Sequence, residues 1–170
     1  MEKNKLFNQG RNLIEPEMLP FYEVVELNGG DAMMFQGELT TDFFIVKSGK
    51  MQVIESSGGK AVVLDTLGAG DSFGEMSFFD EGGRSATVRS SGKSVLYRLT
   101  REHLADMARM QPQLAMEYLI TLGKLISGKL RRIDRMIAGV TGDQKVKKDP
   151  DLKKLVFNIK RAMKSRKDIF

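Results

Sequence analysis

Residues 73 to 89 read Phe-Gly-Glu-Met-Ser-Phe-Phe-Asp-Glu-Gly-Gly-Arg-Ser-Ala-Thr-Val-Arg, a segment that brings flexible glycines, acids, hydroxyls and arginines close together. Gly74 lets the backbone approach a ligand without a side chain in the way. We expect Glu75 to Phe79 to form a short helical turn whose free N–H groups attract anions. The glycine turn that follows leads to Arg84, whose planar set of donors suits a phosphate group. The segment therefore predicts an anion-binding site.

Glu75 narrows the class of anion. A carboxylate beside a bound phosphate is repelled unless it has another group to bind, and sugar hydroxyls are suitable donors. A phosphate held by Arg84 and a ribose hydroxyl held by Glu75 describe a nucleotide whose phosphate lies close to its own sugar. The structural alternative is that the helix dipole alone favours Glu in a first turn, and that Gly-Gly-Arg turns occur on many β proteins.

The same residues resemble a known motif. Phe73-Gly74-Glu75 opens the segment, Phe78-Phe79 follows as a hydrophobic pair, and Arg84-Ser85-Ala86 closes it. This order resembles the phosphate-binding cassette of the cyclic nucleotide-binding domain family, which is found in catabolite-activator-type regulators, cyclic-nucleotide-dependent kinases and gated channels. The likeness covers about residues 20 to 138. Ser77 departs from the small apolar residue often found at its position, with little expected effect because the backbone N–H makes the contact.

This resemblance implies a ligand and the residues that bind it. The ligand would be cAMP or cGMP, with cAMP favoured and no metal required. Arg84 would neutralise the cyclic phosphate, and Glu75 would accept a hydrogen bond from the ribose 2′-hydroxyl. Ser85 does not separate the two nucleotides, because cGMP-selective and cAMP-binding members both carry a hydroxyl there. The expected ligand-binding residues are Phe73, Gly74, Glu75, Met76, Ser77, Arg84, Ser85 and Ala86.

From residue 21 onward, apolar or alternating runs are divided by glycine turns every ~8 to 12 residues, as in all-β sandwiches and barrels. Phe43-Phe44-Ile45-Val46 predicts a strand buried on both faces, whereas the alternation that includes Val62 and Leu64 predicts half-buried strands. The predicted class is mainly β with flanking helices (α+β), a jelly-roll-like antiparallel β-roll or double-stranded β-helix followed by a long C-terminal helix. Strands are expected at 21–27, 32–36, 42–47, 50–55, 60–67, 84–90 and 94–99.

A helical period begins after Thr100, which suits an N-cap, and Pro112 starts a second, long helix. Apolar residues recur along that helix every three or four positions, which favours a homodimer seam over packing on the chain's own roll alone. By the resemblance, the helix would also close over the base, with Arg131, Arg132 and Arg135 as lid candidates. The seam residues are Leu119, Leu122, Ile126, Leu130, Ile133, Met136, Ile137 and Val140.

Positive charge is concentrated at the end of the chain. Residues 141–170 hold ten Lys or Arg against four Asp, whereas residues 1–140 hold 17 basic against 18 acidic side chains. A basic amphipathic helix in this tail would dock on the domain or contact a partner protein, a membrane surface or nucleic acid. The predicted parts are an N-terminal helical segment (1–20), the β-roll (21–110), the long helix (111–140) and the basic linker and tail (141–170).

Composition excludes several classes of protein. The chain has no cysteine and one histidine, which argues against thiolate and multi-histidine metal sites and against an enzyme. It has no long apolar run, so no membrane span is expected and a cytoplasmic protein is the default. We expect a receptor that signals to an effector protein. The alternatives are a catabolite-activator-type transcription regulator, for which residues 141–170 are too few to form the DNA-binding module, and a scaffold that retains the roll without the ligand.

Overall fold

The computed structural model describes residues 13–57 and 59–142. The predictions for residues 1–12 and for the tail from 143 onward therefore lie outside the described residues. The chain divides into two compact units, Met1–Leu125 and Ile126–Phe170. The elements, in order, are η2 (Pro16–Phe21), β1 (Glu23–Leu27), β2 (Ala32–Met34), β3 (Phe43–Ser48), β4 (Met51–Ser57), β5 (Lys60–Leu67), β6 (Ser72–Phe73), α1 (Glu75–Asp80), β7 (Thr87–Ser90), β8 (Ser94–Leu99), α2 (Arg101–Met110) and α3 (Pro112–Gly142).

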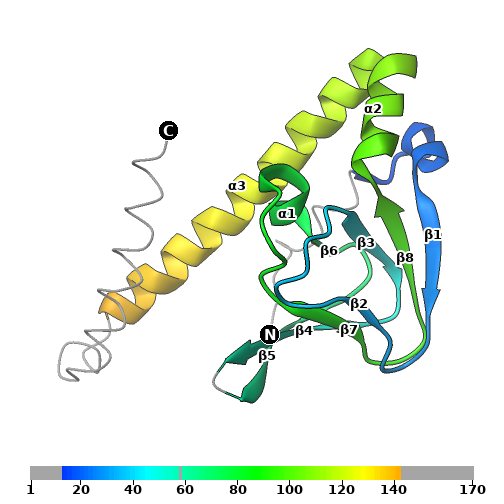
Figure 1. The fold of residues 1–170 in the computed structure, drawn as a ribbon. Coiled ribbons are helices and arrows are strands. Elements are labelled where there is room, and N and C mark those ends of the chain that lie inside the picture. Colours follow the sequence, from blue (N-terminus) through cyan, green and yellow to red (C-terminus); the bar gives the residue numbers. More distant parts are fainter. Residues whose placement is uncertain (1–12, 58, 143–170) are drawn as a thin grey trace. The chain divides into compact units, whose positions relative to one another are not determined.

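Two four-stranded antiparallel sheets form the β-roll (Figure 1). One sheet has the strand order β1-β8-β3-β6 and the other has the order β2-β7-β4-β5. Together with α1 and the C-terminal helices, this confirms the predicted class. The expected strand 84–90 begins later, at Thr87, because Arg84 to Ala86 form an irregular segment before the sheet.

The core lies between the sheets and is built from large apolar side chains. All four residues from Phe43 to Val46 are buried, as expected for a strand covered on both faces. Phe44 of β3 lies opposite Arg98 of β8 on one side and Phe73 of β6 on the other. The buried cluster comprises Leu27, Met34, Phe44, Val46, Met51, Leu67, Phe73, Val88 and Leu96. Since Phe73 opens the predicted cassette, the core anchors its start.

The prediction that Val62 and Leu64 are half-buried is wrong. Their side chains are 56% and 58% exposed, and that of Val63 is 51% exposed. The reason is that β5 pairs only with β4 and forms the outer edge of its sheet (Figure 1). An edge strand that projects beyond its neighbours leaves both of its faces accessible.

The tyrosines connect the helical segments to the roll. The Tyr118 hydroxyl of α3 and that of Tyr22, which precedes β1, lie 2.9 Å apart, and Tyr22 donates to the backbone oxygen of Leu13 at 2.9 Å. The Tyr22 ring also lies 5.6 Å from that of Tyr97. Burial raises the pKa of both Tyr22 and Tyr118, so both hydroxyls stay neutral even where an exposed tyrosine would ionise. The first half of α3 is thereby fixed to its own roll.

The two predicted helix starts are confirmed. Thr100 caps α2, since its hydroxyl accepts from the His103 N–H at 3.1 Å while the Thr100 N–H donates to His103 Nδ1 at 3.5 Å. Pro112 is the first residue of α3. Leu122 of the expected seam is fully buried within the first unit, so it packs on its own roll and not on a second chain. Leu119 and Leu130 are 41% and 53% exposed.

Candidate functional site

The expected cassette forms a strand, a glycine corner and one short helix. β6 ends at Phe73, whose ring stacks on Phe44 with centroids 5.0 Å apart. Gly74 then turns the chain with a φ of 85°, and α1 follows from Glu75 to Asp80. A methyl group placed on Gly74 would lie 2.7 Å from Nη1 of Arg84 and 2.7 Å from the backbone oxygen of Asp42. Glycine is therefore required here both for its backbone conformation and for the close approach of two other segments.

Two anchors hold α1 in place. On its inner face the Phe78 ring is buried with its centroid 6.0 Å from that of Phe43. At its end, Arg101 of α2 donates from Nε to the Phe78 carbonyl at 2.8 Å and forms an ion pair with Glu81. An arginine that binds the last carbonyls of a helix stabilises its C-terminus. The cassette helix is thus tied to both β3 and α2.

The guanidinium of Arg84 lies inside the cassette. The residue is only 2% exposed, and its Nη1 donates to the Gly74 carbonyl at 3.2 Å and to the Ser77 hydroxyl at 3.4 Å. Its Nε donates to Thr40 Oγ1 at 2.8 Å, and its Cζ lies 5.8 Å from the centre of the Phe44 ring. Nη2 takes part in none of these three hydrogen bonds. A buried, fixed arginine of this kind is suited to binding an anion.

Carboxylates around Arg84 offset the cost of burying its charge. Burial lowers the pKa of Arg84, and the negative charges of Asp42, Glu38 and Glu75, in that order of effect, partly restore it. Glu75 is half-buried at the start of α1. The structure therefore brings the predicted acid and the predicted base together at one site, nine positions apart in the chain.

The remaining predicted site residues surround this pair in different ways. Ser77 is buried and its hydroxyl accepts from Arg84, so the serine does more than supply a backbone N–H. Ala86 is buried, whereas Ser85 is exposed. The Met76 side chain is 47% exposed. The expected backbone contacts of these residues with a ligand stay a prediction.

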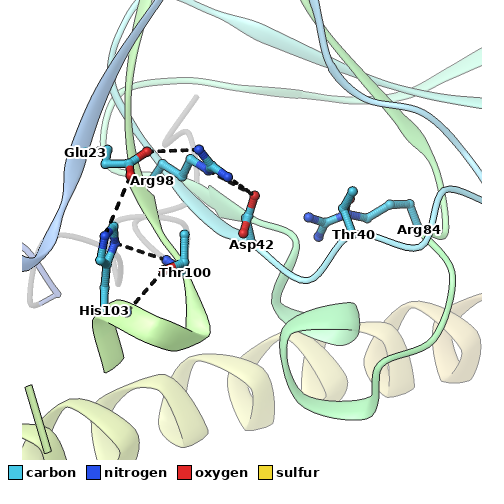
Figure 2. A network of polar contacts seen from close by, with 7 residues as sticks. All are labelled: Glu23, Thr40, Asp42, Arg84, Arg98, Thr100 and His103. Atoms are coloured by element: carbon cyan, nitrogen blue, oxygen red, sulfur yellow. Dashed lines mark hydrogen bonds and ion pairs between the residues drawn. The ribbon is translucent and has the colours of Figure 1, made fainter. Parts of the chain in front are cut away.

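A network of charged side chains adjoins the site and was not predicted from the sequence (Figure 2). Asp42 binds Arg98 of β8, with Nε and Nη2 of the arginine 2.9 and 2.8 Å from Oδ2. Nη1 of Arg98 contacts Glu23 of β1 at 2.9 Å, and Glu23 lies 3.7 Å from Nε2 of His103. Asp42 thus serves two arginines, Arg84 in the cassette and Arg98 in the sheet. Nothing in the sequence pattern marks these partners, because they come from segments that are far apart in the chain.

Residues 13–57 and 59–142 offer neither a metal-binding cluster nor a membrane-spanning helix. No group of three or more His, Cys, Asp or Glu side chains in this part of the chain is arranged to hold a metal ion. No helix in it is long and apolar enough to cross a membrane. The predicted lid arginines, Arg131, Arg132 and Arg135, belong to the second unit, and their role stays a prediction.

Comparison with known proteins agrees with this geometry. The family model described as cyclic nucleotide-binding domain matches residues 24–111. The chain is 35% identical over 106 residues to the cyclic AMP receptor protein of Thermus thermophilus, covering 62% of this chain and 47% of that protein. It is 36% identical over 86 residues to the cAMP-dependent protein kinase regulatory subunit of Mycosarcoma maydis, covering 51% of this chain and 16% of that one. The chain thus spans less than half the length of either relative.

The fold has a solved counterpart. The crystal structure of the Thermus thermophilus catabolite activator protein superposes with a TM-score of 0.66 at 29% identity, covering 78% of this chain and 63% of that one. The β-roll and its cassette thus have the architecture of a cyclic nucleotide-binding domain. The chain belongs to the cyclic nucleotide-binding domain family, because the family model matches more than half of its residues.

We predict that Gly74→Ala destabilises the fold more than Gly37→Ala does. Both glycines have nearly the same positive φ, 85° and 84°, but a methyl group on Gly37 meets nothing within 4 Å. Each substitution costs about 1 kcal/mol for the left-handed backbone, and only Gly74→Ala adds a clash. Urea unfolding should give a free energy of unfolding at least ~1 kcal/mol lower for Gly74→Ala than for Gly37→Ala. Equal losses would show that the approach of Arg84 and Asp42 to Gly74 is not close.

Proposed function

We propose that the protein is a cyclic nucleotide receptor in which Arg84 neutralises the cyclic phosphate and Glu75 accepts a hydrogen bond from the ribose 2′-hydroxyl. The observation that carries this proposal is the placement of a buried, oriented guanidinium beside a half-buried carboxylate at the start of α1. A cyclic nucleotide places its phosphate and its ribose hydroxyl within reach of one such pair. Binding at the cassette would be reported through α3 to a partner protein.

The favoured ligand is cAMP, with cGMP as the alternative. The two relatives described above are both named for cyclic AMP. Ser85 is exposed beside the cassette, so its hydroxyl is accessible to a base in either nucleotide. Ser85 thus favours neither nucleotide, and the selectivity between cAMP and cGMP is obtained by comparing their measured affinities.

A binding role, and not catalysis, fits the use that the fold makes of His103, the one histidine of the chain. Its Nδ1 accepts from the backbone of Thr100 at the start of α2, and its Nε2 faces Glu23. A histidine occupied in this way supports a helix end and does not act as a general base at the cassette.

We place the receptor in the cytoplasm, the location expected from its sequence.

We also propose a homodimer through α3. Ala115, Tyr118 and Leu122 are buried on the face that packs on the roll. With 3.6 residues per turn, Met116 and Ile120 lie away from that face and Leu119 lies at its border, and the three residues are 64%, 52% and 41% exposed. An apolar stripe along one helix is suited to pairing with a second copy of the same helix.

Two alternative functions, a transcription regulator and a scaffold without a ligand, predict experimental results that differ from those of a receptor. A transcription regulator of the catabolite-activator type would retard DNA in a gel at moderate salt, whereas contacts from the basic tail alone would be lost as salt rises. A scaffold that keeps the roll but has lost the ligand would bind no cyclic nucleotide. The support for the receptor is the placement of the Glu75 charge near the buried Arg84 guanidinium, which a scaffold does not require.

We predict that Arg84→Ala weakens cAMP binding by at least about tenfold, because the cyclic phosphate then loses a buried, charge-assisted partner. Isothermal titration calorimetry against cAMP and cGMP measures this. Arg89→Ala, which removes an exposed arginine of β7, is the matched control and should leave the affinity within about twofold. Arg84→Lys keeps the charge and provides a second test if the alanine variant fails to fold. An unchanged affinity in a folded Arg84 variant would contradict the mechanism.

We predict that Ile120→Glu converts a dimer into a monomer, because a charge in an apolar helix pair is left without compensation. Sedimentation equilibrium should give twice the monomer mass for the wild type and the monomer mass for the variant. Met110→Glu, at a 72% exposed position of α2, is the control and should leave the dimer intact. A monomeric wild-type chain, or a dimer that survives Ile120→Glu, would rule out this interface.

A further inference from the structure

Thr40 lies in the segment between β2 and β3, and this segment is joined to Arg84 by the backbone. The Gly37 N–H donates to the Arg84 carbonyl at 2.8 Å, and the Arg84 N–H donates to the Glu38 carbonyl at 2.9 Å. The two segments are also close at the preceding residue, since a methyl group on Gly83 would lie 3.2 Å from the Gly37 oxygen. The segment that carries Thr40 is therefore held in register with the cassette arginine.

The Thr40 hydroxyl makes the shortest of the three hydrogen bonds from the Arg84 side chain. Oγ1 accepts from Nε at 2.8 Å, whereas the two bonds from Nη1 measure 3.2 and 3.4 Å. Nε lies at the base of the planar guanidinium, so a partner there sets the direction in which the two terminal nitrogens point. The Phe44 ring, 5.8 Å from Cζ, packs near the same group. Figure 2 shows Thr40 beside the Arg84 side chain.

We propose that Thr40 is a positioning residue for ligand binding, which orients the Arg84 guanidinium so that its terminal nitrogens meet the cyclic phosphate. This inference rests on the proposed function. It adds a residue from outside the cassette, 44 positions earlier in the chain, to the binding site.

The surroundings of Arg84 explain why this orientation needs a dedicated acceptor. The carboxylates of Asp42, Glu38 and Glu75 all attract the guanidinium. Without an acceptor at Nε, the buried donor is left unpaired and the group turns toward one of these acids. A guanidinium that must first be turned back to the phosphate binds it less tightly, because part of the interaction energy is used for reorganisation.

The test compares four single variants by titration calorimetry with cAMP and cGMP as probes. Thr40→Val removes the acceptor and keeps the shape, and we expect it to weaken binding about five- to tenfold, within the range of the net contribution of one typical hydrogen bond. Thr40→Ser restores the hydroxyl and should return the affinity to within about twofold of wild type. The control is Thr41→Val at the adjacent, equally half-buried threonine, which should have no effect. The fourth variant, Arg84→Lys, lacks the guanidinium and therefore the Nε–H group that donates to Thr40.

A double-mutant cycle separates positioning from a general structural role. In the Arg84→Lys background, Thr40→Val should cause less than about twofold further loss, because the interaction that it removes is already absent. An equal loss in both backgrounds, or a Thr40→Val affinity equal to wild type, would overturn the role of Thr40 alone. Wild-type protein that binds neither nucleotide would overturn the proposed function, and the role of Thr40 with it.

Discussion

The burial of one guanidinium constrains the whole cassette. Arg84 is 2% exposed, and a buried charge is tolerated only where hydrogen-bond acceptors and opposite charges surround it. The acceptors come from three places: Gly74 at the corner before α1, Ser77 within α1 and Thr40 in the segment before β3. Each of these three segments must therefore be held at a defined position relative to the Arg84 guanidinium. The left-handed turn at Gly74, where Arg84 and Asp42 approach the backbone closely, fits this requirement.

The same constraint connects the cassette to the rest of the first unit. Asp42 partly balances the charge of Arg84 while it binds Arg98 on β8, and Arg98 in turn contacts Glu23 on β1. Partial burial works to lower the pKa of Arg98, but hydrogen bonds and charges from Asp42 and Glu23 outweigh this effect and raise it. A second connection runs from α1 to α2 through Arg101. If a cyclic phosphate changes the charge balance at Arg84, these contacts give the change a physical route to α2, which precedes α3.

Much of this arrangement follows from local sequence, and the rest depends on contacts between distant segments. The corner at Gly74 and the cap at Thr100 were predictable because their partners lie within a few residues. The roles of Thr40 and Asp42 were not, because their hydrogen-bond partners are 44 and 56 positions away. For the same reason the pattern of β5 did not reveal that it is an edge strand. Leu122 has the spacing of a dimer-seam residue but is buried against its own β-roll. Periodicity identifies the apolar face of a helix and does not identify what covers that face.

In the proposed receptor, Arg84 and Glu75 bind one cyclic nucleotide between them. A crystal structure of the full chain with cAMP tests this most directly. We expect an exocyclic phosphate oxygen within hydrogen-bond distance of the Arg84 guanidinium, and the ribose 2′-hydroxyl hydrogen-bonded to the Glu75 carboxylate of the same chain. A nucleotide bound elsewhere, or one in the cassette that touches neither side chain, would contradict it.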